Sequence, residues 1–243
     1  MNPNLSWASI ALLASITLLS GCATFSPDGG FAPVQQTARE RLGQELRWAR
    51  TDDEQAAIDQ RVAALLAQPL SIDDAVQLAL LNNKGLQAAF FELGIEEADA
   101  VAAGRLPNPG FSWARLSRSG EREIERGLHL DLARLLALPL LQEVSSRRFA
   151  QAQSAAAMQV LALAGQTRQA WVAAVAAEES VRYATQVMQA AEASAELARR
   201  MAQVGNFSKL QQAREQGFYA DAALGLVRAE QARRSTRERL TRL

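Results

Sequence analysis

The sequence predicts a mainly α-helical protein with a long antiparallel coiled-coil helical hairpin and a single β-hairpin. Three observations support this prediction. Apolar residues make up 49% of the chain and aromatic residues only 6%, so Ala, Leu and Val dominate, in a composition that favours helices. From Pro139 to Gln203 there is no further proline and only one glycine, Gly165. Apolar and polar residues alternate, as is typical of strands, only between residues 111 and 132.

The overall charge and the rare reactive residues exclude several classes of protein. The chain of 243 residues has a formal net charge of +0, which argues against a nucleic-acid partner. Its single cysteine, Cys22, cannot form an intramolecular disulfide. With only one histidine, His129, a zinc centre or a Cys/His nucleophile pair is not expected. We expect no catalytic residues, no metal and no cofactor.

The N-terminus predicts a signal peptide over residues 1–21. Residues 10–19 form an apolar run of about ten residues, too short for a spanning helix of roughly 20. The run leads into Leu19-Ser20-Gly21-Cys22, which resembles the bacterial lipobox, where the peptide is cut before a cysteine that then carries lipid such as palmitate. An ordinary signal peptide with a chance cysteine is the alternative. The absence of Asp after Cys22 points to the outer membrane.

That signal peptide departs from the usual pattern in one respect. Met1 to Trp7 contain no Lys or Arg, although signal peptides usually begin with a positively charged region. A different start codon would explain the difference.

Residues 22–69 are predicted to form a lipid-anchored tether and an amphipathic helix. Residues 24–33 contain two prolines and two glycines, so we expect an extended tether. The pattern is helical from Val34 to Gln68. Its apolar positions are Leu42, Leu46, Ile58, Val62, Leu65 and Leu66.

Residues 70–106 are predicted to form short helices. Ser71 can cap a helix over Ile72 to Asn82, with Asp74 three residues later as in a capping box. Asn82-Asn83-Lys84-Gly85 interrupts the pattern. A second helix is predicted from Leu86 to about Arg105.

Residues 107–138 are predicted to form a β-hairpin. Leu106-Pro107-Asn108-Pro109 must end the preceding helix. Phe111 to Leu116 and Ile124 to Leu132 alternate with period two, around the polar turn 117–123.

The second predicted strand has an apolar face and a polar face. Leu128, Leu130 and Leu132 share one face, and His129 and Asp131 share the other. In a soluble sheet the leucine face would pack on the core and the polar face would meet water. In an outer-membrane barrel the leucine face would meet lipid and the polar face would line the lumen. The alternation fits both arrangements. A lone hairpin is marginal in water, which favours the membrane.

Residues 139–243 are predicted to form the long helical hairpin. Pro139 suits the first turn of a helix that continues for about 65 residues, or about 97 Å, to Gln203. Gly205 can adopt the positive φ of the reversal. The first helix has a seam at Val160, Ala164, Thr167, Trp171, Ala174, Val181, Thr185 and Met188. The second has a seam at Leu210, Ala213, Gly217, Ala220, Leu224 and Val227.

The order of these motifs resembles the TolC-like outer-membrane factor family of efflux and secretion ducts. The resemblance runs from Cys22 to the end of the chain. It rests on Leu70-Ser71-Ile72-Asp73-Asp74-Ala75, Ala79-Leu80-Leu81-Asn82-Asn83, Leu106-Pro107-Asn108-Pro109, Leu138-Pro139 and Val204-Gly205. Lys84 stands where the family often has proline.

The resemblance implies a trimer in which each full-length protomer contributes four strands to a barrel and long helices to a periplasmic tunnel. The helical tip at Val204, Gly205, Asn206 and Phe207 would bind a periplasmic adaptor, which links to an inner-membrane pump. Alternatively, Val204 and Phe207 only fasten the two helices together. Family members contain two repeats and this chain contains the N-terminal one, so we expect a C-terminal truncation. We assign none of the family's acidic gate residues.

The expected function is therefore a passive exit duct: the outer-membrane channel component of a tripartite efflux or type I secretion system. The expected location is the outer membrane, lipid-anchored and extending into the periplasm. Two alternatives remain, a periplasmic coiled-coil lipoprotein that serves as a scaffold and a non-functional truncated fragment. An enzyme is disfavoured because the sequence has no Gly-rich phosphate loop and no metal-spaced cluster. Glu96-Glu97 and Glu178-Glu179 are expected to be solvated, and His129 to face the lumen.

Overall fold

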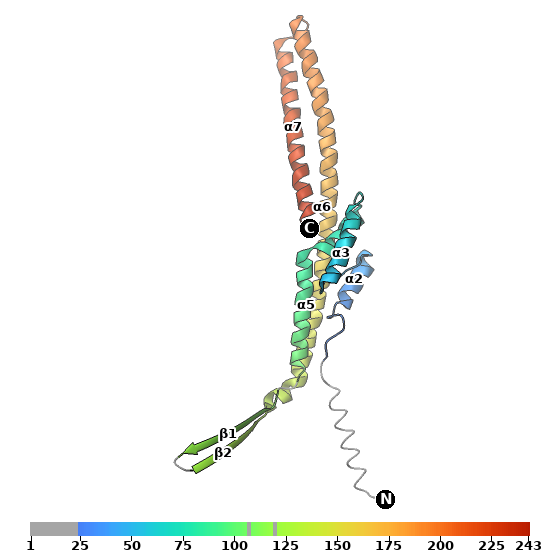
Figure 1. The fold of residues 1–243 in the computed structure, drawn as a ribbon. Helices are drawn as coiled ribbons and strands as arrows, with labels where there is room; N and C mark the ends of the chain where they lie inside the picture. The colour runs from blue at the N-terminus through green and yellow to red at the C-terminus, as the bar shows by residue number, and fades with distance from the viewer. Residues whose placement is uncertain (1–23, 106–107, 119–120) are drawn as a thin grey trace. The chain divides into compact units, whose positions relative to one another are not determined.

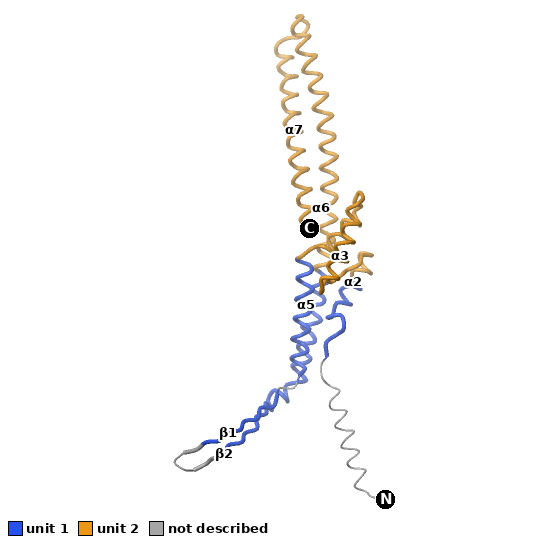
Figure 2. The backbone as a smooth tube through the Cα atoms, viewed as in Figure 1, with its two compact units in different colours: residues 1–37, 85–158 blue, residues 38–84, 159–243 orange. Residues whose placement is uncertain are grey.

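The computed structural model describes residues 24–105, 108–118 and 121–243, and the side chains of 117–123 are not described. The predicted signal peptide and Cys22 lie outside this range, as do Leu106 and Pro107. The described chain is mainly helical, with one two-stranded antiparallel sheet (Figure 1). Two compact units divide it: residues 1–37 with 85–158, and residues 38–84 with 159–243 (Figure 2).

The predicted amphipathic helix over 34–68 is two helices, α2 (Ala32–Leu42) and α3 (Asp52–Leu66). Gly43 ends α2 because its φ of 65° suits the position after a helix, and its N–H donates to the Arg39 carbonyl at 3.1 Å. Thr51 begins α3 through a capping box with Glu54. A glycine and a Thr-x-x-Glu pattern therefore mark a break that helical periodicity alone did not reveal.

The segment 24–33 is not the extended tether that was predicted. Residues 27–30 form a turn, and Phe31 is buried. Asp28 accepts a hydrogen bond from the Ala32 N–H at 2.5 Å, at the start of α2. Burial raises the pKa of Asp28, but hydrogen bonds from Ala32, Gly30 and Ser26 outweigh that effect and hold the pKa below its ordinary value.

Helix α4 (Ile72–Asn82) has the predicted bounds, and the predicted capping box of Ser71 and Asp74 is present. Asn83 separates α4 from α5, as predicted. Helix α5 (Lys84–Ala103) begins two residues earlier and ends two residues earlier than expected. Ile58, Leu65 and Leu81 form a buried cluster between α3 and α4.

The β-hairpin is present, and its second strand has the predicted length of nine residues but begins and ends three residues earlier. Both strands extend into the predicted turn 117–123. Strand β1 (Gly110–Arg118) pairs with β2 (Glu121–His129) in antiparallel register, with Phe111 opposite Leu128. Leu130 follows the strand and Leu132 is the first residue of helix α6. The reason is Asp131, whose carboxylate accepts the Arg134 N–H at 2.9 Å and caps the helix.

Helix α6 (Leu132–Gln203) has 72 residues and ends where predicted, but it begins seven residues before Pro139. Pro139 lies inside the helix and has no N–H to offer the Leu135 carbonyl. The Asp131 cap explains the earlier start, so Pro139 does not mark the beginning. The seam predicted on α6 is buried or half-buried throughout.

Helix α7 (Lys209–Thr241) runs antiparallel beside the second half of α6, within the second unit (Figures 1 and 2). The seam predicted on α7 is wrong, because its residues are exposed: Leu210, Ala213, Gly217, Ala220, Leu224 and Val227. The half-buried positions follow a different stripe with the same three- and four-residue spacing. The stripe contains Gln212, Glu215, Tyr219, Ala222, Leu226, Ala229, Arg233, Thr236 and Leu240, and Ala223, Gly225 and Glu230 are half-buried beside it.

Polar pairs join the two long helices at this inward stripe. Ser194 donates a hydrogen bond to Glu215 at 2.7 Å, and Arg233 lies 3.6 Å from Glu178. Side chains on α6 that face α7 include small buried alanines such as Ala195. Helix α7 thus contacts α6 through a mixed stripe that contains Leu226 and Leu240 as well as polar and small residues, and the predicted seam faces away.

Candidate functional site

The reversal between α6 and α7 has the geometry that glycine permits. Gly205 has a φ of 80°, in the left-handed region that a Cβ disfavours. The Asn206 N–H donates to the Met201 carbonyl at 2.9 Å, and the Gly205 N–H to the Ala202 carbonyl at 3.2 Å. These hydrogen bonds satisfy carbonyls at the end of α6 and fix the turn.

The two apolar residues of the tip differ in exposure. Val204 is 72% exposed, whereas Phe207 is half-buried. The half-buried Phe207 can therefore fasten the two helices together, whereas the exposed Val204 does not have that role. Val204 is an exposed apolar side chain at the turn of a helical hairpin.

Ser208 closes the tip on the side of α7, and sequence reasoning missed it. Its hydroxyl accepts the Gln211 N–H at 3.2 Å, and the Gln211 side chain accepts the Ser208 N–H at 2.9 Å. The signal was present as Ser-x-x-Gln before a helical pattern. The tip is consequently held by two independent local devices, a glycine and a capping box.

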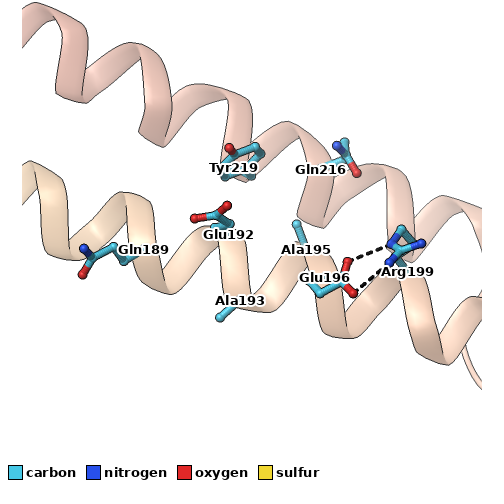
Figure 3. Close-up of a pocket in the computed structure, with 8 residues that line it drawn as sticks. All are labelled: Gln189, Glu192, Ala193, Ala195, Glu196, Arg199, Gln216 and Tyr219. Atoms are coloured by element: carbon cyan, nitrogen blue, oxygen red, sulfur yellow. Dashed lines mark hydrogen bonds and ion pairs between the residues drawn. The ribbon is translucent and has the colours of Figure 1, made fainter.

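A shallow groove of about 500 Å³ lies between α6 and α7 near the tip (Figure 3). In this view the Glu192 carboxylate points toward Tyr219 of α7. Glu196 accepts hydrogen bonds from Arg199 and Arg200, each at 2.7 Å. These hydrogen bonds lower the pKa of Glu196 from 4.5 to about 2. The groove is lined by Gln189, Glu192, Ala193, Ala195, Glu196, Arg199, Gln216 and Tyr219.

The β-hairpin carries large apolar side chains that nothing in the described chain covers. Phe111 is 72% exposed and Leu128, its cross-strand neighbour, is 68% exposed. Trp113 lies on the same face, opposite Arg126. Of the three leucines predicted to share a strand face, only Leu128 belongs to the strand. This face is thus apolar with arginines interspersed.

The other face of the hairpin has little space between its side chains where β1 begins and β2 ends. His129 lies there opposite Gly110, and Ser112 lies opposite Gly127. A Cβ on Gly127 would come 2.5 Å from the Ser112 Oγ, so a larger residue there would require the Ser112 side chain to move. His129 is therefore on the face away from Leu128, as the alternation predicted.

The first turns of α6 are also apolar and exposed. This segment follows β2 after only two residues, Leu130 and Asp131. Its one charged side chain before Glu143 is Arg134. The exposed large side chains are Leu132, Leu135, Leu136, Leu140, Leu141 and Val144. The apolar surface of the hairpin therefore continues onto α6.

The acidic pairs occupy different environments. Glu178 lies 3.6 Å from Arg233, and Glu179 accepts a hydrogen bond from Arg182. The expectation that Glu97 is solvated is wrong, because it is only 6% exposed. Its carboxylate accepts from the Ser26 N–H at 2.6 Å and from the Ser26 hydroxyl. A contact 71 residues apart left no sequence signal.

Within the described ranges, no group of three or more His, Cys, Asp or Glu side chains is arranged to hold a metal ion. No described helix combines the length and apolar character needed to cross a membrane.

Comparison with protein-family models, curated proteins and solved structures found no match for this chain. The function is therefore inferred from the geometry of the tip, the hairpin and the helix surfaces.

Proposed function

We propose that this chain is the outer-membrane component of a tripartite efflux or type I secretion system, a passive exit duct driven by an inner-membrane pump. In this proposal Cys22 carries the lipid anchor, the β-hairpin lies in the outer membrane and the helical tip reaches into the periplasm. One observation carries it. An apolar, exposed hairpin leads within two residues into a helix of 72 residues that reverses at an exposed tip.

The hairpin supports a membrane location through its exposed side chains. A two-stranded hairpin is marginally stable in water by itself, and exposed apolar patches mark membrane or protein contacts. Phe111, Trp113 and Leu128 lie on one face. Trp is common where a membrane meets water, which fits a strand that enters lipid.

The tip supports docking of a periplasmic adaptor. Val204 is exposed at a rigid turn, and the groove beside it offers carboxylates, amides and a phenol. A turn fixed by Gly205 and Ser208 is preorganised, so little conformational entropy is lost on binding. Val204, Gly205, Asn206 and Phe207 are the proposed contact residues.

The outward stripe of α7 supports assembly with further copies of this chain. Its spacing of three and four residues is that of a helix-packing seam, and Ala213, Gly217 and Ala220 permit close approach. Helix α6 presents exposed residues on one face at steps of four and seven residues: Val172, Ala176, Tyr183, Ala190 and Leu197. Packing of one stripe on the other would be head-to-tail, an arrangement that forms a ring where the rotation between copies closes, as in the trimer of the resembled family.

The membrane location is tested on the full chain in a Gram-negative host. Fractionation should place it in the outer membrane, and mass spectrometry should find the mature N-terminus at an acylated Cys22. A Cys22→Ser variant is the matched control for the anchor. A water-soluble periplasmic protein that keeps its helical hairpin would instead support the scaffold alternative.

A photo-cross-linking residue at Val204 tests the tip. It should capture a periplasmic adaptor, whereas the same residue at exposed Asp52 of α3 should not. Equal capture at both positions would contradict docking at the tip.

A further inference from the structure

A buried carboxylate joins the segment after Cys22 to helix α5. Glu97 lies on α5 and is 6% exposed. It accepts two hydrogen bonds from one residue, Ser26, through the backbone N–H at 2.6 Å and through the hydroxyl. Both residues belong to the first unit. A buried carboxylate is costly unless such donors satisfy it, so the pair holds the segment firmly.

The residues that follow Ser26 reinforce this attachment. The Ser26 hydroxyl oxygen accepts the Gly30 N–H at 2.7 Å, and the Gly30 carbonyl accepts the Gln153 side-chain N–H of α6 at 3.0 Å. Phe31 packs edge-on against Phe90 of α5, with ring centroids 4.8 Å apart. The segment is thus fixed to α5 and α6 at three points.

Gly30 is required for this path of the chain. Its φ is 72°, and a Cβ there would come 2.2 Å from the Phe149 ring. Glycine therefore permits both the turn and the close approach to α6.

We infer that Glu97 is a positioning residue that sets where the lipid anchor meets the membrane relative to the β-hairpin. Three residues lie between Cys22 and Ser26, so the chain limits an anchor at Cys22 to about 14 Å from Ser26. The hairpin belongs to the same unit as Glu97. The partner of this surface is a bilayer, entered by the acyl chains and by the hairpin together. The inference rests on the proposed acylation of Cys22.

The experiment uses the full chain in outer-membrane vesicles with Leu128→Cys as the only free thiol, since acylation blocks Cys22. Labelling by a membrane-impermeant maleimide reports exposure of the hairpin. Glu97→Ala should raise labelling several-fold, and Ser26→Ala, which removes only the hydroxyl, should raise it less. Asp99→Ala, on the exposed side of α5, is the matched control and should leave labelling unchanged.

The decisive comparison repeats Glu97→Ala in a Cys22→Ala background. A positioning role requires that Glu97→Ala adds nothing once the lipid is absent, so the two substitutions must be strongly non-additive. Equal increases with and without an acylated Cys22 would mean a structural role only, and would overturn the inference while leaving the proposed function intact. An unmodified Cys22 in mass spectra would overturn both the anchor and this inference. Should Glu97→Ala fail to fold, Ser26→Ala decides by the same comparison.

Discussion

Glu196 is the residue whose protonation the structure perturbs most clearly near the tip. Its carboxylate accepts hydrogen bonds from Arg199 and Arg200, one turn further along α6. They favour the ionised form and lower its pKa to about 2. The hydrogen bond from Arg199 to Glu196 also raises the pKa of Arg199. Because all three side chains are well exposed to solvent, the pairing orders the surface of the groove more than it stabilises the fold.

This pairing predicts a pH dependence for the last turns of α6. A carboxyl with a folded-state pKa below its unfolded value of 4.5 contributes stability that is present above pH 4.5. That contribution is lost as the pH falls toward about 2. Carbon-detected NMR titration of Glu196 should give a midpoint well below that of an unpaired Glu. Arg199→Gln should shift the midpoint upward, and Arg182→Gln, two turns or more away, should not. A Glu196 midpoint near 4.5 in the unaltered chain would refute the pairing.

At the scale of single elements, the capping residues decide where helices and strands end. Asp131 begins α6 and thereby ends β2 at His129. Gly43 and Thr51 divide what periodicity alone presented as one helix. In each case a few local hydrogen bonds outweigh a pattern that extends over many residues. The second strand consequently ends three residues earlier than predicted, so that Leu130 follows the strand and Leu132 begins α6.

The register of the hairpin makes a prediction about its two faces. Leu128 lies on the apolar face opposite Phe111, and His129 lies on the other face opposite Gly110. Leu128→Arg should destabilise membrane insertion by about 2–4 kcal/mol if the residue lies near the midplane. His129→Arg should cost less, and it serves as the matched control. Urea titration of the chain in lipid vesicles measures both, and equal costs would contradict a lipid-facing Leu128.

The turn between the long helices makes a second prediction at this scale. Gly205→Trp should abolish adaptor cross-linking from Val204 while membrane insertion is retained, because the bulky side chain covers the tip. Gly205→Ala distinguishes the effect of backbone strain from the effect of a bulky side chain. An alanine at φ 80° is strained, but its methyl group is too small to cover Val204. We expect Gly205→Ala to keep cross-linking and to lose some stability. Wild-type cross-linking by Gly205→Trp would exclude a docking role for the turn.

At the scale of the whole molecule, the described chain leaves several apolar surfaces uncovered. They include the hairpin face that contains Leu128, the first turns of α6 and the outward stripes of α6 and α7. Within the described residues, α7 has no buried residue although it runs beside α6. A helix with so little burial gains most of its stability from packing partners. The surfaces are those expected of a chain that works within an assembly and a membrane.

The outward stripe of α7 predicts that assembly depends on Leu224. Leu224→Arg places a charge in the proposed seam between copies and should reduce the cross-linked oligomer in detergent extracts several-fold. Arg214→Ala, at an exposed position of the same helix outside the stripe, should leave the oligomer unchanged. A monomer in the unaltered chain, or an oligomer that is insensitive to Leu224→Arg, would disprove the seam.

The sequence alone determined the elements whose signals are local. The bounds of α4, the end of α6, the reversal at Gly205 and the pairing of two strands each depend on residues within one or two turns. A capping box is formed by two residues that lie three positions apart in the sequence, and glycine adopts a positive φ readily because it has no Cβ. These parts of the candidate site, including the tip, were therefore predictable.

Tertiary structure decided which faces are covered and which segments are held. The predicted seam of α7 was expected to face α6, but a mixed stripe faces α6 instead, and its contacts include the Ser194–Glu215 hydrogen bond and the Arg233–Glu178 ion pair. The segment after Cys22 was predicted to be an extended tether, but Ser26 donates hydrogen bonds to Glu97, 71 residues away, and the segment forms a turn. Hydrophobic periodicity shows that a face will be covered, and it does not say by what. The neighbour is chosen by contacts between distant residues, which only the folded chain brings together.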